Sequence, residues 1–523
     1  MTALKTTKAI VIGAGIGGLV SAALLAARGV DVRVFERAPA SGGKLRVHEV
    51  GGLEIDAGPT VLTMRWVFDE LFAEAGACLD DALTLVPSRV LARHAWSEGT
   101  AVARLDLPAD FEAAVDAIGR FAGAADARGY RAFCARAGAI HDALEKPFLR
   151  AGRTDIPGLL WRGGLKGLPG LLRISPFASL WPELGRHFSD PRLRQLFGRY
   201  ATYCGSSPWL APATLMLVAH VERMGLWRVD GGMQRIAQAV EALATRSGAR
   251  FRFGTQVDEI VECDGRACGV RLVDGEVVPA DVVVFNGDVN ALATGLLGAP
   301  ARRGLGADAR RRQAAGGRSL SALTWSVAAR SSGLPLLRHN VLFSQDYAAE
   351  FQALSAGRLP DDPTVYVCAQ DRGDDEPPVD AQAPQRLLCL VNAPAAVPGR
   401  HLTQQEIATC EHQAFRRMAR CGLQLDPVAP MQRTTPDDFA TLFPGTGGAL
   451  YGPPSHGWRA SFQRMGARHA MPGLYLAGGS THPGPGVPMA ALSGRLAAYA
   501  VCEDLVSTSS PRPMAMRGGM STR

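Results

Sequence analysis

The sequence predicts a mixed α/β fold built around a parallel sheet, and three features support this prediction. A β-branched run at 10–12 precedes a glycine-rich turn, an apolar stretch and a second strand-forming run that ends at Glu36. A similar order of strand, glycine-rich loop and helix returns at 474–505. The length of 523 residues leaves room for two or three domains. The first segment has the order of a dinucleotide-binding βαβ unit.

The glycines of the first turn have separate roles. Gly13 makes the tight turn, Gly15 lets the backbone approach a pyrophosphate, and Gly18 lets the helix pack closely on the sheet. The amides that open this helix favour an anion, because the positive end of the helix dipole lies there. Glu36 follows the second strand, where a carboxylate can accept hydrogen bonds from ribose hydroxyls. The sequence therefore predicts that the chain binds a dinucleotide.

A membrane-spanning helix is the alternative for residues 9–27, which carry no charge. The four glycines within 13–18 argue against it, since each costs a helix interior about 1 kcal/mol relative to alanine. The β-branched residues before them prefer a strand. A secretory signal is disfavoured because no small-residue cleavage site follows the apolar part.

A second pair of glycines narrows the choice of cofactor. Ser41–Lys44 and Ile55–Thr60 follow Glu36 after short loops, and paired glycines let the chain pass close to a flavin or its pyrophosphate. This spacing resembles that of the flavin amine oxidase and carotenoid desaturase superfamily, whereas simple nicotinamide dehydrogenases lack the second pair. The pattern favours FAD over NAD. The candidate cofactor contacts here are Gly43, Lys44, Gly58, Pro59 and Thr60.

Cysteine usage and charge exclude several other classes of protein. The ten cysteines include no C-x-x-C, and the close pair Cys263 and Cys268 flanks an Asp264-Gly265 turn. We therefore expect no metal site and no disulfide, and a reducing cytoplasmic compartment. The net charge of +7 is modest, and no basic run interleaved with aromatics predicts nucleic-acid binding.

The middle of the chain returns to the nucleotide-binding pattern. Asp230–Met233 opens an amphipathic helix that runs to about Arg246. Strands are expected at 250–255, 257–262 and 269–273, and a continuous buried strand at 280–285.

The segment 473–489 is the most discriminating part of the sequence. It reads as a strand, a glycine–proline loop that contains Thr481-His482-Pro483-Gly484, and a helix start. Its glycines let the backbone lie against an isoalloxazine ring, and Pro488 suits the first turn of a helix. The N-terminal dipole of that helix would stabilise the negative charge of a reduced flavin. The candidate contacts are Gly478, Gly479, Thr481, Val487, Pro488 and Met489.

Together these motifs resemble the bacterial phytoene-type carotenoid desaturases over nearly the whole chain. Amine oxidases usually carry a glutamate after the corresponding glycine, whereas this chain has Gly479-Ser480. Residues 63–68, 199–208, 319–325 and 487–495 resemble the hydroxyneurosporene and methoxyneurosporene desaturase branch.

The resemblance implies an α/β fold in which a Rossmann-like FAD-binding domain is interleaved with a substrate domain. It implies an oxidoreductase of carotenoid and photosynthetic pigment biosynthesis that introduces a C3–C4 double bond into acyclic 1-hydroxycarotenoids. It also implies that the backbone at Val257 meets the adenine end of FAD. Phytoene desaturation is the alternative, and a non-catalytic isoprenoid-binding protein of the GDP-dissociation-inhibitor type is the alternative from another class.

The expected chemistry requires an apolar tunnel more than a strong base. Hydride transfer to the flavin leaves an allylic cation that the polyene delocalises, and loss of a proton from the neighbouring carbon completes the double bond. His482 is the candidate catalytic residue, and bracing of its loop is its alternative role. Tyr200 and Tyr203 could hydrogen-bond a substrate hydroxyl or simply pack. Trp209–Val221 is interpreted as tunnel wall or plain core.

The expected partners are a carotenoid, a membrane surface and an electron acceptor such as a quinone or oxygen, while the oligomeric state stays open. Ile156–Pro182 combines tryptophan, leucine and basic residues without an acid, as in an interfacial segment, and a buried loop is its alternative. We expect a cytoplasmic, peripherally membrane-associated protein. Its FAD-binding domain would comprise 1–65, 228–292 and 468–506, its substrate and membrane-contact domain 66–227 and 293–467, and its disordered tail 507–523.

Overall fold

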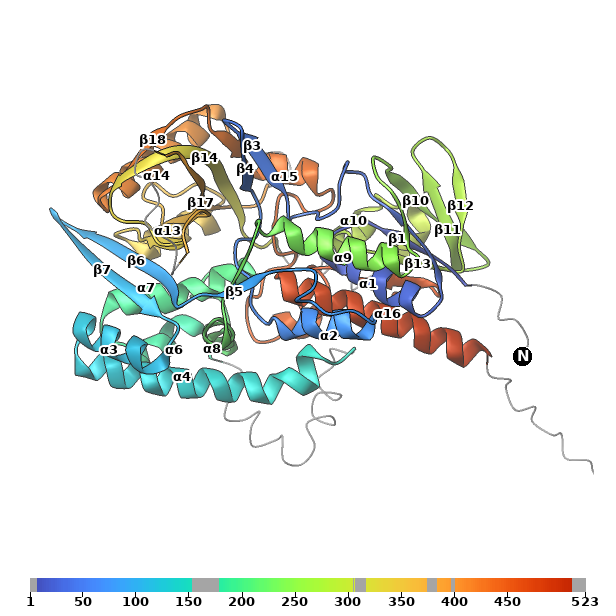
Figure 1. The fold of residues 1–523 in the computed structure, drawn as a ribbon, viewed down its shortest axis with the longest axis horizontal. Coiled ribbons are helices and arrows are strands. Elements are labelled where there is room, and N and C mark those ends of the chain that lie inside the picture. Colours follow the sequence, from blue (N-terminus) through green and yellow to red (C-terminus); the bar gives the residue numbers. More distant parts are fainter. Residues whose placement is uncertain are drawn as a thin grey trace, which may run out of the picture.

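The computed structural model describes residues 7–152, 178–303, 305, 317–373, 383–396 and 400–509. It confirms the mixed α/β fold: two large sheets lie at opposite ends of the longest axis, and helices pack below and between them (Figure 1).

The first sheet is parallel and has the strand order β20–β13–β1–β2–β9. Its strands come from three separated parts of the sequence, so this sheet joins the two ends of the chain to its middle. The bounds are β1 (Lys8–Ile12), β2 (Asp31–Phe35), β9 (Arg250–Arg252), β13 (Val282–Phe285) and β20 (Leu474–Leu476).

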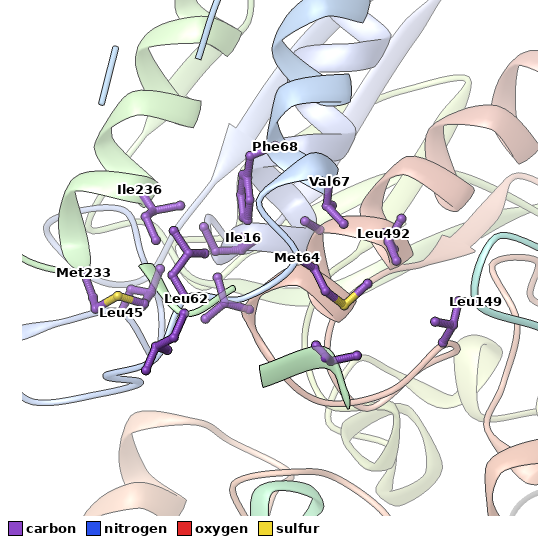
Figure 2. Packing of buried hydrophobic residues seen from close by; sticks show 14 of the residues in the cluster. Ile16, Leu45, Leu62, Met64, Val67, Phe68, Leu149, Met233, Ile236 and Leu492 are labelled. Atoms are coloured by element: carbon purple, nitrogen blue, oxygen red, sulfur yellow. The ribbon is translucent and has the colours of Figure 1, made fainter. Parts of the chain in front are cut away.

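Three helices cover one face of this sheet, and the first of them contacts the other two closely. They are α1 (Ile16–Ala27), α9 (Gln234–Arg246) and α16 (Val487–Ser509), and α2 (Trp66–Glu74) packs beside α16. Figure 2 shows the buried residues where these helices meet: Ile16 of α1, Phe68 of α2, Ile236 of α9 and Leu492 of α16 converge around Leu62 and Met64. The core therefore extends to the glycine turn that opens α1.

The opposite face of the parallel sheet packs against a small antiparallel sheet, β10 (Val257–Cys263), β11 (Arg266–Leu272) and β12 (Val277–Pro279). Its first hairpin corrects one prediction, because Cys263 and Cys268 form a disulfide with a Cα–Cα distance of 5.8 Å. Cys263 pairs with Arg266, so Cys268 is its diagonal neighbour on the same face of the hairpin. The exclusion of a disulfide was wrong, and the cysteine pattern no longer supports a reducing compartment. The helices α10 (Val289–Thr294) and α11 (Ala299–Arg303) follow β13.

The second large sheet has the strand order β18–β14–β17–β16–β15–β6–β7, with β19 paired to β14. Alternation along β17 divides its two faces: Leu387, Cys389 and Val391 pack on α14 (Gln404–Arg420), while Leu388, Leu390 and Asn392 face a cavity. The bounds are β6 (Val90–Glu98), β7 (Ala101–Pro108), β14 (Ser321–Gly333), β15 (His339–Leu342), β16 (Val365–Ala369), β17 (Gln385–Ala393), β18 (Leu423–Pro427) and β19 (Gln432–Thr434).

A helical layer lies under the second sheet and reaches the first one (Figure 1). It consists of α3 (Phe111–Ala122), α4 (Ala124–Leu144), η1 (Glu145–Leu149), α6 (Leu180–His187), α7 (Pro191–Gly198), η2 (Arg199–Cys204), η3 (Ala213–Met216) and α8 (Leu217–Met224). The remaining elements are β3 (Val47–Val50), β4 (Leu53–Asp56), β5 (Leu85–Pro87), β8 (Trp227–Val229), α13 (Tyr347–Ser355), α15 (Pro436–Leu442) and η4 (Ala460–Gln463).

Within the described ranges, every helix is too short or too polar to span the hydrocarbon core of a bilayer. Most of the predicted interfacial segment Ile156–Pro182 lies outside the described residues, as does the tail from residue 510. The tail was predicted to begin at residue 507, but α16 continues to Ser509.

A buried glutamate on α13 generates a prediction about stability. Burial raises the pKa of Glu350 from its ordinary value of 4.5 to about 7, although Ser344 Oγ and Thr364 Oγ1 each donate to its Oε2 at 2.7 Å. A raised pKa means that the folded state favours the protonated carboxyl. Glu350 therefore contributes about 3 kcal/mol to the free energy of unfolding at low pH. This contribution is complete below about pH 4.5 and is lost as the pH rises through about 7.

Glu350→Gln should therefore gain stability relative to the wild type as the pH rises from 4.5 to 8, because glutamine stays neutral. Thermal unfolding temperatures measured across this range would check it. Exposed Glu54→Gln is the matched control and should follow the wild type. A constant difference between Glu350→Gln and the wild type at all pH values would contradict the prediction.

Candidate functional site

One cavity of about 1700 Å³ lies between the two large sheets. Its wall includes fourteen predicted contacts, which the structure brings together from the N-terminal, middle and C-terminal parts of the chain: Gly13, Gly15, Glu36, Gly43, Lys44, Gly58, Pro59, Thr60, Val257, Gly478, Gly479, Val487, Pro488 and Met489. Gly18, Thr481 and His482 are absent from this wall and lie behind it.

The turn between β1 and α1 has the geometry that its glycines predict. Gly13 has φ +94°, and its amide donates to Phe35 O at 2.8 Å, which ties the turn to β2. A Cβ on Gly18 would lie 2.1 Å from Gly13 O, so only glycine lets α1 begin this close to the turn. Gly15 precedes the first helical residue, and a Cβ there would lie 3.0 Å from Asn286 Nδ2. The turn therefore presents bare backbone and helix amides to the cavity.

Glu36 is buried beside this turn and binds two backbone amides. Ala14 N donates to Oε2 at 2.7 Å and Ala38 N donates to Oε1 at 2.8 Å. A carboxylate offers about four lone-pair sites, so acceptor capacity remains for the hydroxyls of a ribose. The side chain thus holds the turn and still faces the cavity.

The second glycine pair lies directly against the first turn. Gly42 N donates to Ala14 O at 2.9 Å, and a Cβ on Gly43 would lie 3.3 Å from the Cα of Gly15. Gly58 passes so close to this loop that a Cβ would lie 1.8 Å from Lys44 O. These approaches leave a groove bordered by backbone, which suits a long planar ligand with a pyrophosphate.

Lys44 brings a cation to this groove. Its ammonium group donates to Leu450 O and lies 5.5 Å from the centroid of the Phe443 ring. Burial lowers the pKa of Lys44, and the charge of Asp288 partly offsets that effect.

The C-terminal loop closes the groove from the side of β20. Gly478 has φ +107°, and its amide donates to Ser493 Oγ at 3.2 Å. Thr481 Oγ1 donates to Gly478 O at 2.7 Å and hydrogen-bonds Ser493 Oγ at 2.6 Å, so it holds the loop from behind. Helix α16 then begins at Val487, with Pro488 in its first turn and Met489 on the cavity wall. The positive end of the helix dipole lies at the cavity, as predicted.

His482 is buried and bound to the end of the helical layer. Its Nε2 lies 2.9 Å from Phe148 O, and a carbonyl can only accept, so Nε2 carries the proton. The imidazole and the Phe148 ring meet edge to face with centroids 4.7 Å apart. This arrangement braces the loop against η1.

Two residues that the sequence analysis missed hold these loops together. Asn286 Nδ2 donates to Gly13 O at 3.2 Å, and its Oδ1 lies 2.9 Å from the position of a Cβ on Gly478. Arg464 donates to the carbonyl oxygens of Tyr451, Pro453 and Gly479 at 3.3, 2.8 and 3.3 Å. Burial lowers the pKa of Arg464 to about 10. No local motif marks either residue, although Asn286 directly follows a predicted buried strand.

Another section of the wall is largely apolar. It includes Leu144, Phe148 and Leu149 from the helical layer, Leu215, Leu217, Val218 and Val221 from η3 and α8, and Leu388 and Leu390 from β17. Trp209–Val221 therefore contributes to the tunnel wall through Leu215, Leu217, Val218 and Val221.

A polar group interrupts this apolar wall at η2 and α8. Tyr203 Oη accepts from Arg199 Nη1 at 2.7 Å and donates to Glu222 Oε1 at 3.1 Å. Tyr200 donates to the other oxygen of Glu222. Arg199, Tyr203 and Glu222 line the cavity, whereas Tyr200 is buried behind them.

One group among the described residues could hold a metal ion, although none was predicted. His141, Asp142 and His220 bring ligand atoms within 4.8 Å of one another. Arg223 Nη2 lies 3.5 Å from His220 Nδ1, and its positive charge disfavours a cation there.

Comparison with known proteins gives one family. The profile of flavin containing amine oxidoreductases matches residues 16–502. The chain is 53% identical to hydroxyneurosporene desaturase of Rubrivivax gelatinosus over 99% of this chain and 98% of the relative. It is 45% identical to hydroxyneurosporene desaturase of Cereibacter sphaeroides over 96% and 99% of the two chains.

Solved structures show the same fold at low sequence identity. An oxidoreductase from Methanosarcina mazei superposes with a TM-score of 0.61 at 17% identity, covering 95% of this chain and 100% of the other. Wild-type putrescine oxidase bound to putrescine gives 0.59 at 14% identity, covering 95% and 99%. The family profile and the desaturase relatives confirm the resemblance to the flavin amine oxidase and carotenoid desaturase superfamily, and the cofactor is FAD.

Gly15→Val should abolish FAD retention. A branched side chain at this turn would occupy the space of the pyrophosphate and press on Asn286. Flavin absorbance of the purified protein after reconstitution would measure occupancy, and thermal unfolding would show that the variant is folded. Gly119→Ala, where a Cβ makes only a 3.5 Å contact, is the control and should retain FAD. Full occupancy in a folded Gly15→Val variant would refute this assignment of the turn.

Proposed function

Because the chain belongs to the flavin-containing amine oxidoreductase family, and within it to the carotenoid desaturases, we propose that it introduces the C3–C4 double bond into acyclic 1-hydroxycarotenoids. Relatives named hydroxyneurosporene desaturase at 40–53% identity support this substrate class. The observation that carries the proposal is the single cavity that joins the dinucleotide motifs to a largely apolar wall.

Each predicted contact has a proposed role in holding FAD. Gly13 and Gly15 with the start of α1 would bind the pyrophosphate, and Glu36 the ribose. The backbone at Val257 would meet the adenine end. Gly43, Lys44, Gly58, Pro59, Thr60, Gly478, Gly479 and Val487–Met489 would surround the isoalloxazine, while Gly18 and Thr481 would act through packing and loop support. When bound, FAD supplies the hydride acceptor for oxidation of a CH₂–CH₂ unit.

The protein's own contribution is positioning and the exclusion of water. A carotenoid offers few polar handles, so apolar walls from β17, η3 and α8 would hold the chain by burial of its surface. Correct placement of the reacting carbons supplies much of the rate acceleration. Loss of a proton next to a polyene is eased by delocalisation, so no strong base is demanded of the protein.

We propose peripheral membrane association, since a substrate this apolar partitions into lipid. The division into an interleaved FAD-binding domain and a substrate and membrane-contact domain remains the proposal made from the sequence. Electrons would leave for an acceptor such as a quinone or oxygen.

Turnover with paired substrates tests the function. The FAD-loaded protein should convert 1-hydroxyneurosporene to its 3,4-didehydro product faster than it converts phytoene, and liposomes should raise the rate of both. Product analysis by chromatography and absorption spectra would measure this. Conversion of phytoene alone would overturn the proposed substrate, and a folded protein that never retains FAD would favour the isoprenoid-binding alternative.

His482→Ala should retain FAD and lose only modest activity, about tenfold or less, because the imidazole braces the loop at Phe148 O. His482→Gln is the companion variant, since its amide can still donate to that carbonyl and should recover activity. Measuring the turnover rate and the flavin occupancy of both variants would distinguish bracing of the loop from proton acceptance. A loss of several orders of magnitude in both variants at full occupancy would instead make His482 the proton acceptor.

A further inference from the structure

The polar group at η2 and α8 is unusual for its surroundings. Arg199 and Glu222 are only 6% and 3% exposed, yet both border an otherwise apolar section of the cavity. Burying two charges costs desolvation energy that their attraction often fails to exceed, so stability alone explains the pair poorly. A function at the cavity surface explains it better.

Tyr203 is the member of this group that offers a free hydrogen-bonding site to a ligand. Its side chain is part-exposed and lines the cavity, whereas Tyr200 is 1% exposed and lies behind it. The phenol accepts one hydrogen bond from Arg199 and donates one to Glu222. One acceptor lone pair remains. Burial raises the pKa of Tyr203, so the phenol stays protonated.

Two observations connect this group to residues that are assigned to the flavin. Gly205, two residues after Tyr203, packs so closely that a Cβ there would lie 2.5 Å from the Tyr451 ring, and Tyr451 O accepts from Arg464. Arg464 in turn donates to Gly479 O. Tyr366 lines the same cavity as Tyr203, and its hydroxyl lies 2.7 Å from Thr60 Oγ1. The segment that carries Tyr203 is therefore tied to the loop of Gly479, and its phenol shares a cavity with Thr60.

The chemistry of the proposed substrate requires a polar contact at such a place. In a 1-hydroxycarotenoid, C1 is separated from C3 by two bonds. When C3 and C4 lie at the flavin, the tertiary hydroxyl must lie close to it as well, and the polyene extends away along the apolar wall. An unpaired hydroxyl in that position would weaken binding of the substrate, because it would lose its hydrogen bonds to water without a replacement.

We propose that Tyr203, held in place by Arg199 and Glu222, accepts the hydrogen bond of the substrate's C1 hydroxyl and so selects 1-hydroxylated carotenoids. This inference rests on the proposed function and adds the residues that determine specificity. Neither Arg199 nor Glu222 takes part in bond breaking, since both act by fixing the phenol.

The test compares two substrates that differ only in the hydroxyl, 1-hydroxyneurosporene and 1,2-dihydroneurosporene, with FAD-loaded protein in liposomes. The measured quantity is the ratio of their kcat/KM values. In Tyr203→Phe the preference for the hydroxylated substrate should fall by about tenfold or more, which corresponds to at least 1.4 kcal/mol. General damage to the fold would lower both values together and leave the ratio unchanged.

Tyr200→Phe is the matched control, because it removes a buried hydroxyl from the same group without touching the cavity wall. Its ratio should equal that of the wild type. Glu222→Gln provides a second test if Tyr203→Phe does not fold, and it should also lower the ratio by weakening the anchor of the phenol.

The outcomes separate the two proposals. If the wild type converts 1-hydroxyneurosporene and Tyr203→Phe keeps the wild-type ratio, the assignment of Tyr203 falls and the proposed function stands. If Tyr200→Phe lowers the ratio as much as Tyr203→Phe does, the group acts as a structural unit and the assignment also falls. If the wild type converts phytoene but no hydroxylated carotenoid, the proposed function fails first.

Discussion

The close approach of the 13–18 turn and Gly478 to Asn286, and of Gly494 to Gly17, is the constraint on which the rest of the site depends. A Cβ on Gly17 would lie 2.6 Å from Asn286 Oδ1 and 2.8 Å from Gly478 N, and a Cβ on Gly494 would lie 2.2 Å from Gly17 O. Helices α1 and α16 can therefore cross in direct backbone contact, and Ser21 Oγ donates to Gly494 O at 2.9 Å across the crossing. Because this contact joins the two ends of the sequence, it aligns the glycine turn between β1 and α1 with the loop that follows β20.

The crossing of α1 and α16 fits the way in which both large sheets are placed around the cavity. Strand β13 carries Asn286 at its end and pairs with β1 on one side and β20 on the other, so both loops leave the same edge of the parallel sheet. Ligands bind at the carboxyl ends of strands in such sheets. The second sheet then covers the opening with Leu388, Leu390 and Asn392 of β17, which gives one cavity a nucleotide end and an apolar end.

Local sequence signals predicted the nucleotide end of the cavity well and the apolar end only in part. Glycine spacing, the β-branched runs and Glu36 are short-range patterns, so the turn, α1 and the C-terminal loop followed from the sequence. Asn286 and Arg464 act through contacts with residues far along the chain, and nothing local distinguishes them. The Cys263–Cys268 disulfide depends on a diagonal placement within a hairpin that counting cysteines does not reveal. Tyr203 was noted as a candidate, but its partner Glu222 on α8 was not, since their meeting is a product of helix packing.

The same packing fixes the segment that carries Tyr203 to the loop that is assigned to the flavin. Gly205 ends η2, and its carbonyl accepts from Leu320 N at the entrance to β14. A Cβ on Gly205 would lie 2.5 Å from the Tyr451 ring, and Tyr451 O accepts from Arg464, which also holds Gly479. The segment that carries Tyr203 is thus fixed to the loop assigned to the isoalloxazine by short, buried contacts. Since small displacements of reacting atoms are costly in rate, a hydroxyl anchor built on this frame would set the distance between substrate carbon and flavin as well as the choice of substrate.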